Sequence, residues 1–321
     1  MQVLKMLGAI ALAAVSAAVP AFAADKIKVA APHPTIMPST FIVIAEEMGF
    51  FKRHNIEVEV LWTAGGADAQ QATINGSVDC AVQTGLGGIL SAIQQGAPVV
   101  IGGSDMTGAS DLIWYTRADK LFKTLADLGA TNTASFSRPG ASSETVIKTL
   151  LQHYKSPARA VPSGSPPETL TQVMSGQIDA GWITAPLPKE FAEGKVRILA
   201  RGNDAPQLAA ITTRVHAFNG TYAQKNPQAV KSFLKGYDEA IDAVYADPKA
   251  LARASEMLKV TPEQGRQILA EFFPRKAFTI DKIGDLDASI AQAVANKTLK
   301  APLTDAQKTA IHKTVADFNA K

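Results

Sequence analysis

The chain has a single cysteine, Cys80, among its 321 residues. One thiol excludes an intramolecular disulfide and a structural zinc site built on cysteines. The five histidines are scattered, and none shows the His-Glu-x-x-His spacing of a helical zinc site. The sequence also contains no Gly-Lys-Ser/Thr phosphate-binding loop and no Gly-x-Ser-x-Gly nucleophile turn. We therefore expect no metal and no cofactor.

The chain also has little excess of charge of either sign. Lysine and arginine total 32 against 29 acidic residues, which gives a net charge of +3, and no dense basic block is present. Nucleic-acid-binding domains usually carry a basic stripe, so we expect no nucleic-acid partner. The chain is 46% hydrophobic and 19% charged, which is typical of a globular protein. Its length predicts two domains.

A targeting signal occupies residues 1–23. Lys5 precedes an uncharged apolar run over residues 6–19, and Ala21 and Ala23 supply the small side chains that a signal peptidase requires. The alternative is a membrane anchor, but the run is shorter than the ~20 residues that a spanning helix needs. We predict cleavage after Ala23 and export to a bacterial periplasm.

Strand and helix patterns alternate through the first two thirds of the chain. Short apolar or period-two runs are separated by segments with helical periodicity, which predicts α/β architecture with mainly parallel sheets. The predicted strands are 27–31, 56–61, 78–82, 98–102, 112–116, 133–136, 159–161, 178–183 and 196–200. The predicted helices are 39–51, 67–74, 88–95, 142–153 and 167–175, and the chain after residue 227 is almost entirely helical.

A weak internal repeat suggests two lobes of like topology. Residues 75–81 resemble residues 175–181, since each has a helix end, a glycine and a strand that carries aspartate at the same place. Crossings near 112–116 and 209–214 would join the lobes. The predicted organisation is lobe I from 24–113 and 212–321, with the C-terminal helices, and lobe II from 114–211. Chance similarity of two helix–glycine–strand turns is the alternative.

In several short phrases spread from residue 44 to residue 180, the sequence resembles the substrate-binding proteins of ABC importers, specifically the nitrate/sulfonate/taurine-type family. The matching phrases are residues 44–52, 56–61, 76–79, 96–99, 125–128 and 176–180. The chain departs from the family pattern at Asn55 and at Ala130, where glycine and lysine are usual. The resemblance implies a two-lobed type II periplasmic-binding fold, a two-strand hinge and a small-molecule ligand between the lobes. It also implies a monomer that meets the transmembrane subunits of an ABC permease and their ATPase.

Candidate ligand-binding residues follow the carboxyl ends of the predicted strands, where open α/β sheets bind their ligands. Glycines there allow close approach of the backbone, hydroxyls offer hydrogen bonds, and the helices that open at Ala67 and Ser142 present N–H groups to an anion. The predicted set is His33, Thr35, Ser39, Gly65, Gly66, Thr84, Gly85, Thr107, Arg138, Gly140, Ala141, Ser142, Ser143, Trp182 and Thr184.

Three of these residues have an equally plain structural interpretation. Arg138 could pair with an anionic ligand through two hydrogen bonds, or it could be a loop arginine that faces solvent. His33 could contact the ligand, or it could support the prolines around it. Trp182 could stack on an organic ligand, or it could belong to the core.

The predicted function is that of a periplasmic solute-binding component of an ABC importer. It would capture a small solute of sulfonate, nitrate or carboxylate type by closing its lobes, and it would not be an enzyme. One alternative is an enzyme on the same fold, like those of thiamine pyrimidine synthesis. Those enzymes use a cysteine-rich stretch, and this chain has only Cys80. Another is a ligand-sensing partner of a membrane receptor.

Overall fold

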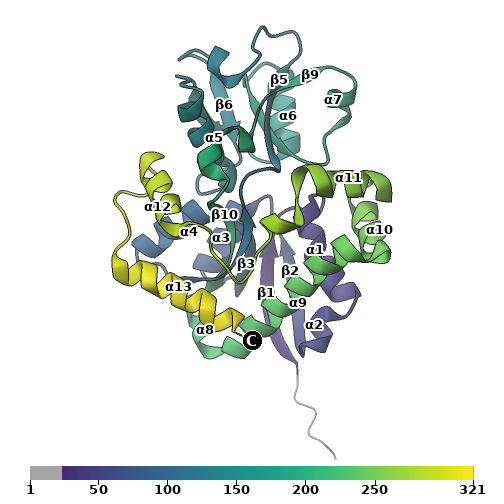
Figure 1. Ribbon diagram of the computed structural model, residues 1–321, viewed down its shortest axis with the longest axis vertical. Helices are drawn as coiled ribbons and strands as arrows, with labels where there is room; N and C mark the ends of the chain where they lie inside the picture. Colours follow the sequence, from purple (N-terminus) through teal and green to yellow (C-terminus); the bar gives the residue numbers. More distant parts are fainter. Residues whose placement is uncertain (1–23, 321) are drawn as a thin grey trace, which may run out of the picture.

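A computed structural model describes residues 24–320, and the predicted targeting signal lies outside them. Strands and covering helices form two lobes, as predicted (Figure 1). We call the part built on the five-stranded sheet lobe I and the part built on the three-stranded and two-stranded sheets lobe II. The mainly parallel sheet predicted for each lobe is found in lobe I, whereas the three-stranded sheet of lobe II is antiparallel. Within residues 24–320, no helix combines the length and the apolarity that crossing a bilayer requires.

Lobe I contains a five-stranded sheet with the order β2-β1-β3-β10-β4. Strand β1 pairs in parallel with β2 and β3, whereas β10 enters between β3 and β4 and runs antiparallel to both. The sheet is therefore mainly parallel with one inserted return strand. Its strands are β1 (Asp25–Ala31), β2 (Ile56–Trp62), β3 (Cys80–Gly85), β4 (Val99–Thr107) and β10 (Thr212–Asn219).

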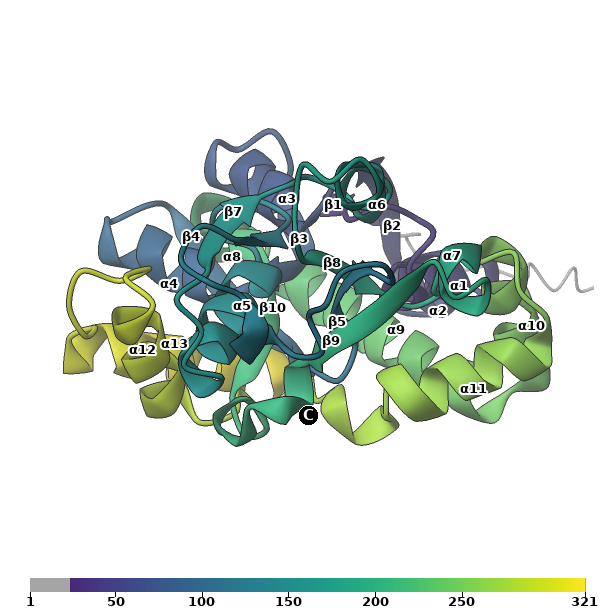
Figure 2. The same ribbon diagram turned by 90° about the horizontal axis from the view of Figure 1, so that it is seen from above.

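Helices from both ends of the chain cover this sheet, as Figures 1 and 2 show. Their apolar faces bury Phe41, Phe51, Phe233 and Tyr237 in one continuous core. The N-terminal helices are α1 (Met37–Glu47), α2 (Phe50–Arg53), α3 (Gly66–Ile74) and α4 (Leu86–Gln94). The C-terminal helices are α8 (Gly220–Lys225), α9 (Pro227–Ala246), α10 (Pro248–Met257), α11 (Pro262–Phe272), α12 (Leu286–Ala295) and α13 (Asp305–Asn319), with the short η4 (Arg275–Ala277) between α11 and α12.

Lobe II is built on β8, β5 and β9, with β5 antiparallel to both neighbours, and on the parallel pair β6 and β7. A parallel bridge between Ala134 and Ala180 joins the two groups. The strands are β5 (Leu112–Arg117), β6 (Thr133–Phe136), β7 (Arg159–Pro162), β8 (Gly181–Thr184) and β9 (Val196–Arg201). The helices are α5 (Ser142–His153), α6 (Pro166–Met174) and α7 (Lys189–Ala192), with short turns η1 (Leu125–Asp127), η2 (Gly202–Asp204) and η3 (Pro206–Leu208).

Two neighbouring segments connect the lobes. One lies between β4 and β5, and the other between β9 and β10. The N–H of Gly108 donates to the carbonyl of Ile211 at 2.9 Å, and the hydroxyl of Thr213 donates to the carbonyl of Gly108 at 2.6 Å. Gly108 has a φ of +87°, which glycine adopts without strain. The two crossings are therefore hydrogen-bonded side by side, as a two-strand hinge requires.

Several element boundaries differ from the prediction. The helix predicted over 39–51 is interrupted by Gly49, whose φ of +73° separates α1 from α2. Strand β3 begins later than predicted and continues through Gly85, and β4 continues to Thr107. Residues expected in loops after these strands therefore belong to the strands, because both pair with β10 along their carboxyl halves. Strand β8 likewise begins only at Gly181.

Candidate functional site

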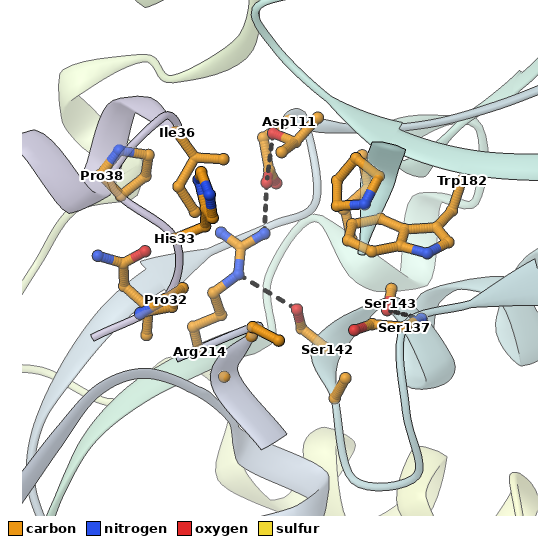
Figure 3. A pocket seen from close by; sticks show the side chains of 18 residues that line it. Pro32, His33, Ile36, Pro38, Asp111, Ser137, Ser142, Ser143, Trp182 and Arg214 are labelled. Atoms are coloured by element: carbon orange, nitrogen blue, oxygen red, sulfur yellow. Dashed lines mark hydrogen bonds and ion pairs between the residues drawn. The ribbon is translucent and has the colours of Figure 1, made fainter. Parts of the chain in front are cut away.

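A cavity of about 80 Å³ lies between the lobes, at the carboxyl ends of the strands (Figure 3). Both lobes line it. Lobe I contributes Pro32, His33, Ile36, Pro38, Ala64, Gly65, Gly66, Gln83 and Arg214. Lobe II and the adjoining crossing contribute Asp111, Leu112, Ser137, Ala141, Ser142, Ser143, Pro166, Trp182 and Thr184.

Arg214 is the central charged group of this cavity. Its side chain projects from β10, and the residue is only 7% exposed. Nη2 donates to Oδ2 of Asp111, Nε donates to Oγ of Ser142 at 3.2 Å, and Nη1 contacts Sδ of Met106 at 2.9 Å. Because Ser142 belongs to lobe II, the guanidinium bridges the two lobes (Figure 3).

Asp111 lies in the crossing between β4 and β5 and is 2% exposed. Its Oδ2 atom accepts from Arg214 and, at 3.4 Å, from the hydroxyl of Thr184. A buried pair of this kind neutralises two charges that would each be costly alone. The cavity is thus lined by an internally compensated ion pair.

Two helices begin at the cavity. Gly65 immediately precedes α3, which begins at Gly66, and Ala141 immediately precedes α5, which begins at Ser142. The hydroxyl of Ser143 accepts from the backbone N–H of Ser137 at 3.0 Å, which fixes the turn before α5. Helix N-termini present backbone N–H groups and a partial positive charge, so both favour an acidic group of a ligand.

Close backbone contacts bring the lobes together beside this cavity. A Cβ atom at Gly85 would lie 2.3 Å from the carbonyl oxygen of Gly140 and 2.7 Å from the nitrogen of Ser142. A Cβ atom at Gly88 would lie 2.6 Å from the same carbonyl oxygen. Glycine is thus required at these two positions of lobe I, where the loop before α5 makes direct backbone contact with lobe I.

Polar contacts between α5 and the end of α12 also join the two lobes. Asn296, which ends α12, donates from Nδ2 to the carbonyl of Thr145 at 3.1 Å and to the hydroxyl of Thr149 at 3.3 Å. Its Oδ1 accepts from Gln152 at 3.2 Å, and its carbonyl accepts from Lys148 at 3.3 Å. One buried asparagine of lobe I therefore binds a whole face of the lobe II helix.

The structure brings eight of the predicted site residues into the cavity. They are His33, Gly65, Gly66, Ala141, Ser142, Ser143, Trp182 and Thr184. Two further predicted residues, Gly85 and Gly140, face each other across the lobe junction.

The other predicted residues lie away from the cavity wall. Thr84 is within β3 and donates to the carbonyl of Val215 at 3.0 Å, and Thr107 bonds to Thr212 at 3.1 Å. Ser39 is buried and donates to the carbonyl of Pro32 at 3.2 Å, so it supports a loop that lines the cavity.

Thr35 and Arg138 also make protein contacts. The hydroxyl of Thr35 bonds to Nδ1 of His33 at 2.8 Å, which orients that ring. Arg138 is half-exposed and pairs with Asp68 of lobe I at 3.3 Å between Nη1 and Oδ1. A surface pair of this kind contributes about 0–1 kcal/mol. The ligand-binding role predicted for both residues stays a prediction.

Sequence reasoning missed Asp111 and Arg214. The sequence predicts residues 209–214 as the return crossing, and the arginine at the end of that crossing is absent from the predicted site. The arginine is flanked by apolar and hydroxyl side chains, and this is a usable signal because arginine is seldom buried without a partner.

A second buried polar pair lies behind the cavity, on β4 and β10. Asp105 and His216 are both fully buried, with Nε2 and Oδ1 3.7 Å apart, and neither side chain has a hydrogen-bond partner. Burial raises the pKa of Asp105 to about 7, an effect that Arg214 opposes and Asp111 reinforces. Burial lowers the pKa of His216 to about 3. Between about pH 3 and pH 7 the Asp105 carboxyl group is therefore protonated and the His216 ring is neutral in the folded protein.

We expect an Asp105→Asn variant to gain stability relative to the unmodified protein as pH rises. A raised carboxyl pKa contributes stability that is complete below the unfolded value, near pH 4, and is lost as pH rises towards about 7. The difference in free energy of unfolding between variant and unmodified protein should change by about 4 kcal/mol over that window. Urea unfolding at several pH values measures it, and a constant difference would refute the assignment.

The comparisons with known proteins agree with this architecture. The NMT1/THI5-like family matches residues 37–251. The chain belongs to the NMT1/THI5-like family. The predicted type II periplasmic-binding fold is confirmed by solved structures that superpose on this chain.

The chain is 24% identical to a 4-amino-5-hydroxymethyl-2-methylpyrimidine phosphate synthase of Saccharomyces cerevisiae. The match extends over 238 residues, which are 68% of this chain and 65% of the yeast protein. The chain thus spans just under two thirds of the length of the curated relatives it matches.

Solved structures share the fold. The alkanesulfonate-binding protein of Xanthomonas axonopodis, bound to MOPS, superposes with a TM-score of 0.72 at 17% identity, covering 87% of this chain and 96% of that one. The periplasmic aliphatic sulphonate-binding protein of Escherichia coli gives a TM-score of 0.66 at 20% identity, covering 88% and 91%. At these identities the likeness establishes the fold.

Proposed function

We propose that this chain is the periplasmic solute-binding component of an ABC importer. It captures a small organic solute with an acidic group between its lobes and delivers it to the transmembrane subunits of the permease. The observation that carries the proposal is the cavity between the lobes, which both lobes line and in which buried Arg214 of lobe I bonds to Ser142 of lobe II.

The mechanism follows from this arrangement. A solute that contacts residues of both lobes, such as His33 and Trp182, makes those contacts together only when the lobes are closed. It therefore shifts the population towards the closed form by its differential affinity for the two forms. The hinge at Gly108 allows the rotation, and the permease recognises the closed shape.

The sulfonate-binding neighbours and the predicted export signal support a transport role, and the acidic class of solute follows from the helix N-termini at the cavity. The yeast synthases favour the second candidate, an enzyme on the same fold. Cys80 does not favour it, because that thiol is fully buried and burial raises its pKa well above the usual range.

Calorimetry on the chain without residues 1–23 tests the proposal. The panel holds sulfonates, carboxylates, nitrate and aromatic acids, each also incubated with the protein and analysed for turnover. We expect at least one member to bind with one solute per chain and to be recovered unchanged. No binding by any member, or conversion of a bound member into a product, would refute the binding-protein function.

A further inference from the structure

Gln83 of β3 combines a buried side chain with a backbone φ of +59°, in the left-handed region, and the residue is 3% exposed. This conformation costs free energy in any residue that has a Cβ atom. The other described non-glycine residues with a positive φ are exposed and lie just after helices, where the helix end explains their conformation. They are Asn55, Lys155, Lys259 and Lys297. The backbone of Gln83 requires a different explanation.

A β-bulge accounts for the conformation of Gln83. Between two regular pairs with β10, strand β3 has one residue more than its partner, so Val82 and Gln83 both lie opposite His216. Glycine adopts the left-handed position of such a bulge most readily, and bulges next to binding sites commonly re-aim a side chain. The bulge itself therefore does not require the long side chain that β3 has at this position.

The side-chain amide of Gln83 is loosely held, although the residue is buried and lines the cavity. Its Nε2 atom donates to the hydroxyl of Tyr237 at 3.4 Å, which leaves the second N–H of the amide without an acceptor among the described residues. Its Oε1 atom lies 3.5 Å from the hydroxyl of Ser39. That hydroxyl has one hydrogen atom and lies closer, at 3.2 Å, to the carbonyl oxygen of Pro32. The amide can therefore still donate a hydrogen bond.

The position of Gln83 suits the acidic end of a solute. A Cβ atom at Gly66 would lie 2.5 Å from the carbonyl oxygen of Gln83, so the backbone of Gln83 packs against the first residue of α3. The N-terminus of that helix favours an acidic group. Arg214 lines the same cavity, but its guanidinium is already paired with Asp111 (Figure 3). An amide beside the helix end adds a donor that no carboxylate neutralises.

We propose that Gln83 is a specificity-determining residue of the cavity, and that its free amide N–H donates to an anionic oxygen atom of the bound solute. This inference rests on the proposed function and assigns one contact within the same cavity. It gives the side chain at the bulge a role that glycine could not fill.

Calorimetry with propanesulfonate, butanoate, benzoate and nitrate tests the proposal on the unmodified protein and on Gln83→Glu. An ionised carboxylate at this position can only accept hydrogen bonds and repels an anion, whereas a protonated carboxyl group donates as the amide does. Burial favours the protonated form. For the probe that binds the unmodified protein most tightly, we expect Gln83→Glu to bind about a hundredfold more weakly at pH 8 but only about threefold more weakly at pH 5, each relative to the unmodified protein at the same pH.

Two further variants separate the hydrogen bond from other effects. Gln83→Met keeps the length of the side chain and removes the amide, so it should lose about tenfold in affinity at both pH values. Gln71→Glu makes the same chemical change at an exposed position of α3 and should leave the affinity unchanged at both. Unfolding midpoints at pH 5 and pH 8 establish that each variant is folded.

The same loss in Gln83→Glu at pH 5 and pH 8 would overturn this inference, because a purely structural role of Gln83 gives that result. An unchanged affinity of Gln83→Met would overturn it too. So would the absence of binding by all four probes, since each carries the anionic oxygen that the contact requires. The proposed function is tested separately, because it fails only if no member of the wider panel binds to the unmodified protein.

Discussion

A Gly85→Ala variant should keep its fold and lose about a hundredfold in solute affinity. Gly85 ends β3 in lobe I, and a methyl group there would lie 2.3 Å from the carbonyl oxygen of Gly140 in lobe II. The three atoms nearest to that methyl group all belong to the backbone, so no flexible side chain could move aside to make room. If the closed population falls a hundredfold, the apparent affinity falls by the same factor.

The Gly85→Ala substitution should affect only the closure of the two lobes. Gly85 has a φ of −64°, which alanine adopts freely, so the open form of the variant is unstrained. The matched control is Gly129→Ala in lobe II, where an added Cβ atom would meet only the side chain of Asn132, at 3.6 Å. Calorimetry measures both affinities, and spin labels at Glu59→Cys and Leu121→Cys report the distance between lobes. A Gly85→Ala protein that binds and closes normally would refute the closure mechanism.

The second large effect concerns stability. An Arg214→Met variant should lose about 3–5 kcal/mol of its free energy of unfolding, because it leaves the carboxylate of Asp111 buried without its cation. Adding Asp111→Asn to the same chain should restore most of the loss, since the uncompensated charge is then gone. Urea unfolding of the two single variants and the double variant gives the coupling between the residues.

The matched control for this buried pair is an ion pair that is exposed to solvent. Arg117 and Asp119 form an ion pair at the surface of lobe II, and Arg117→Met should cost less than about 1 kcal/mol. The account is contradicted if Arg214→Met lowers the free energy of unfolding as little as Arg117→Met does. It is also contradicted if the double variant is as unstable as Arg214→Met alone. In either case the buried pair does not account for the stability of the junction between the lobes.

Local sequence signals determined the parts of the fold that could be predicted. Helix α5 spans Ser142–His153, as predicted, because its start is marked by the turn before Ser142 and its face by regularly spaced apolar residues. Asn55, which stands where the family usually has glycine, has a φ of +53°, in the left-handed region that glycine and asparagine adopt most readily. These features depend on a few neighbouring residues, so the sequence contains the information directly.

Strand lengths depended on partners that are distant in sequence. The carboxyl halves of β3 and β4 are strands because β10, more than a hundred residues later, inserts between them. Nothing near Thr84 or Thr107 indicates that insertion. The expectation that these threonines follow the strands was therefore wrong, since both lie within them.

The ion pair between Asp111 and Arg214 could not be predicted either, because its two partners are also distant in sequence. Asp111 and Arg214 are separated by about a third of the chain and meet because the two crossings of the hinge lie side by side. Their burial depends on the contact between the two lobes rather than on either segment alone. The glycine-rich turns could be assigned to the site from sequence alone, whereas the pairing of Asp111 with Arg214 could not.

Mass spectrometry under native conditions tests the central claim most directly. The claim is that one solute is held between the lobes. We predict that the chain without residues 1–23, saturated with the member of the panel that binds, retains one solute molecule, and that the Gly85→Ala protein treated in the same way retains none. Equal occupancy of the two proteins, or no retained solute in the unmodified one, would contradict the account.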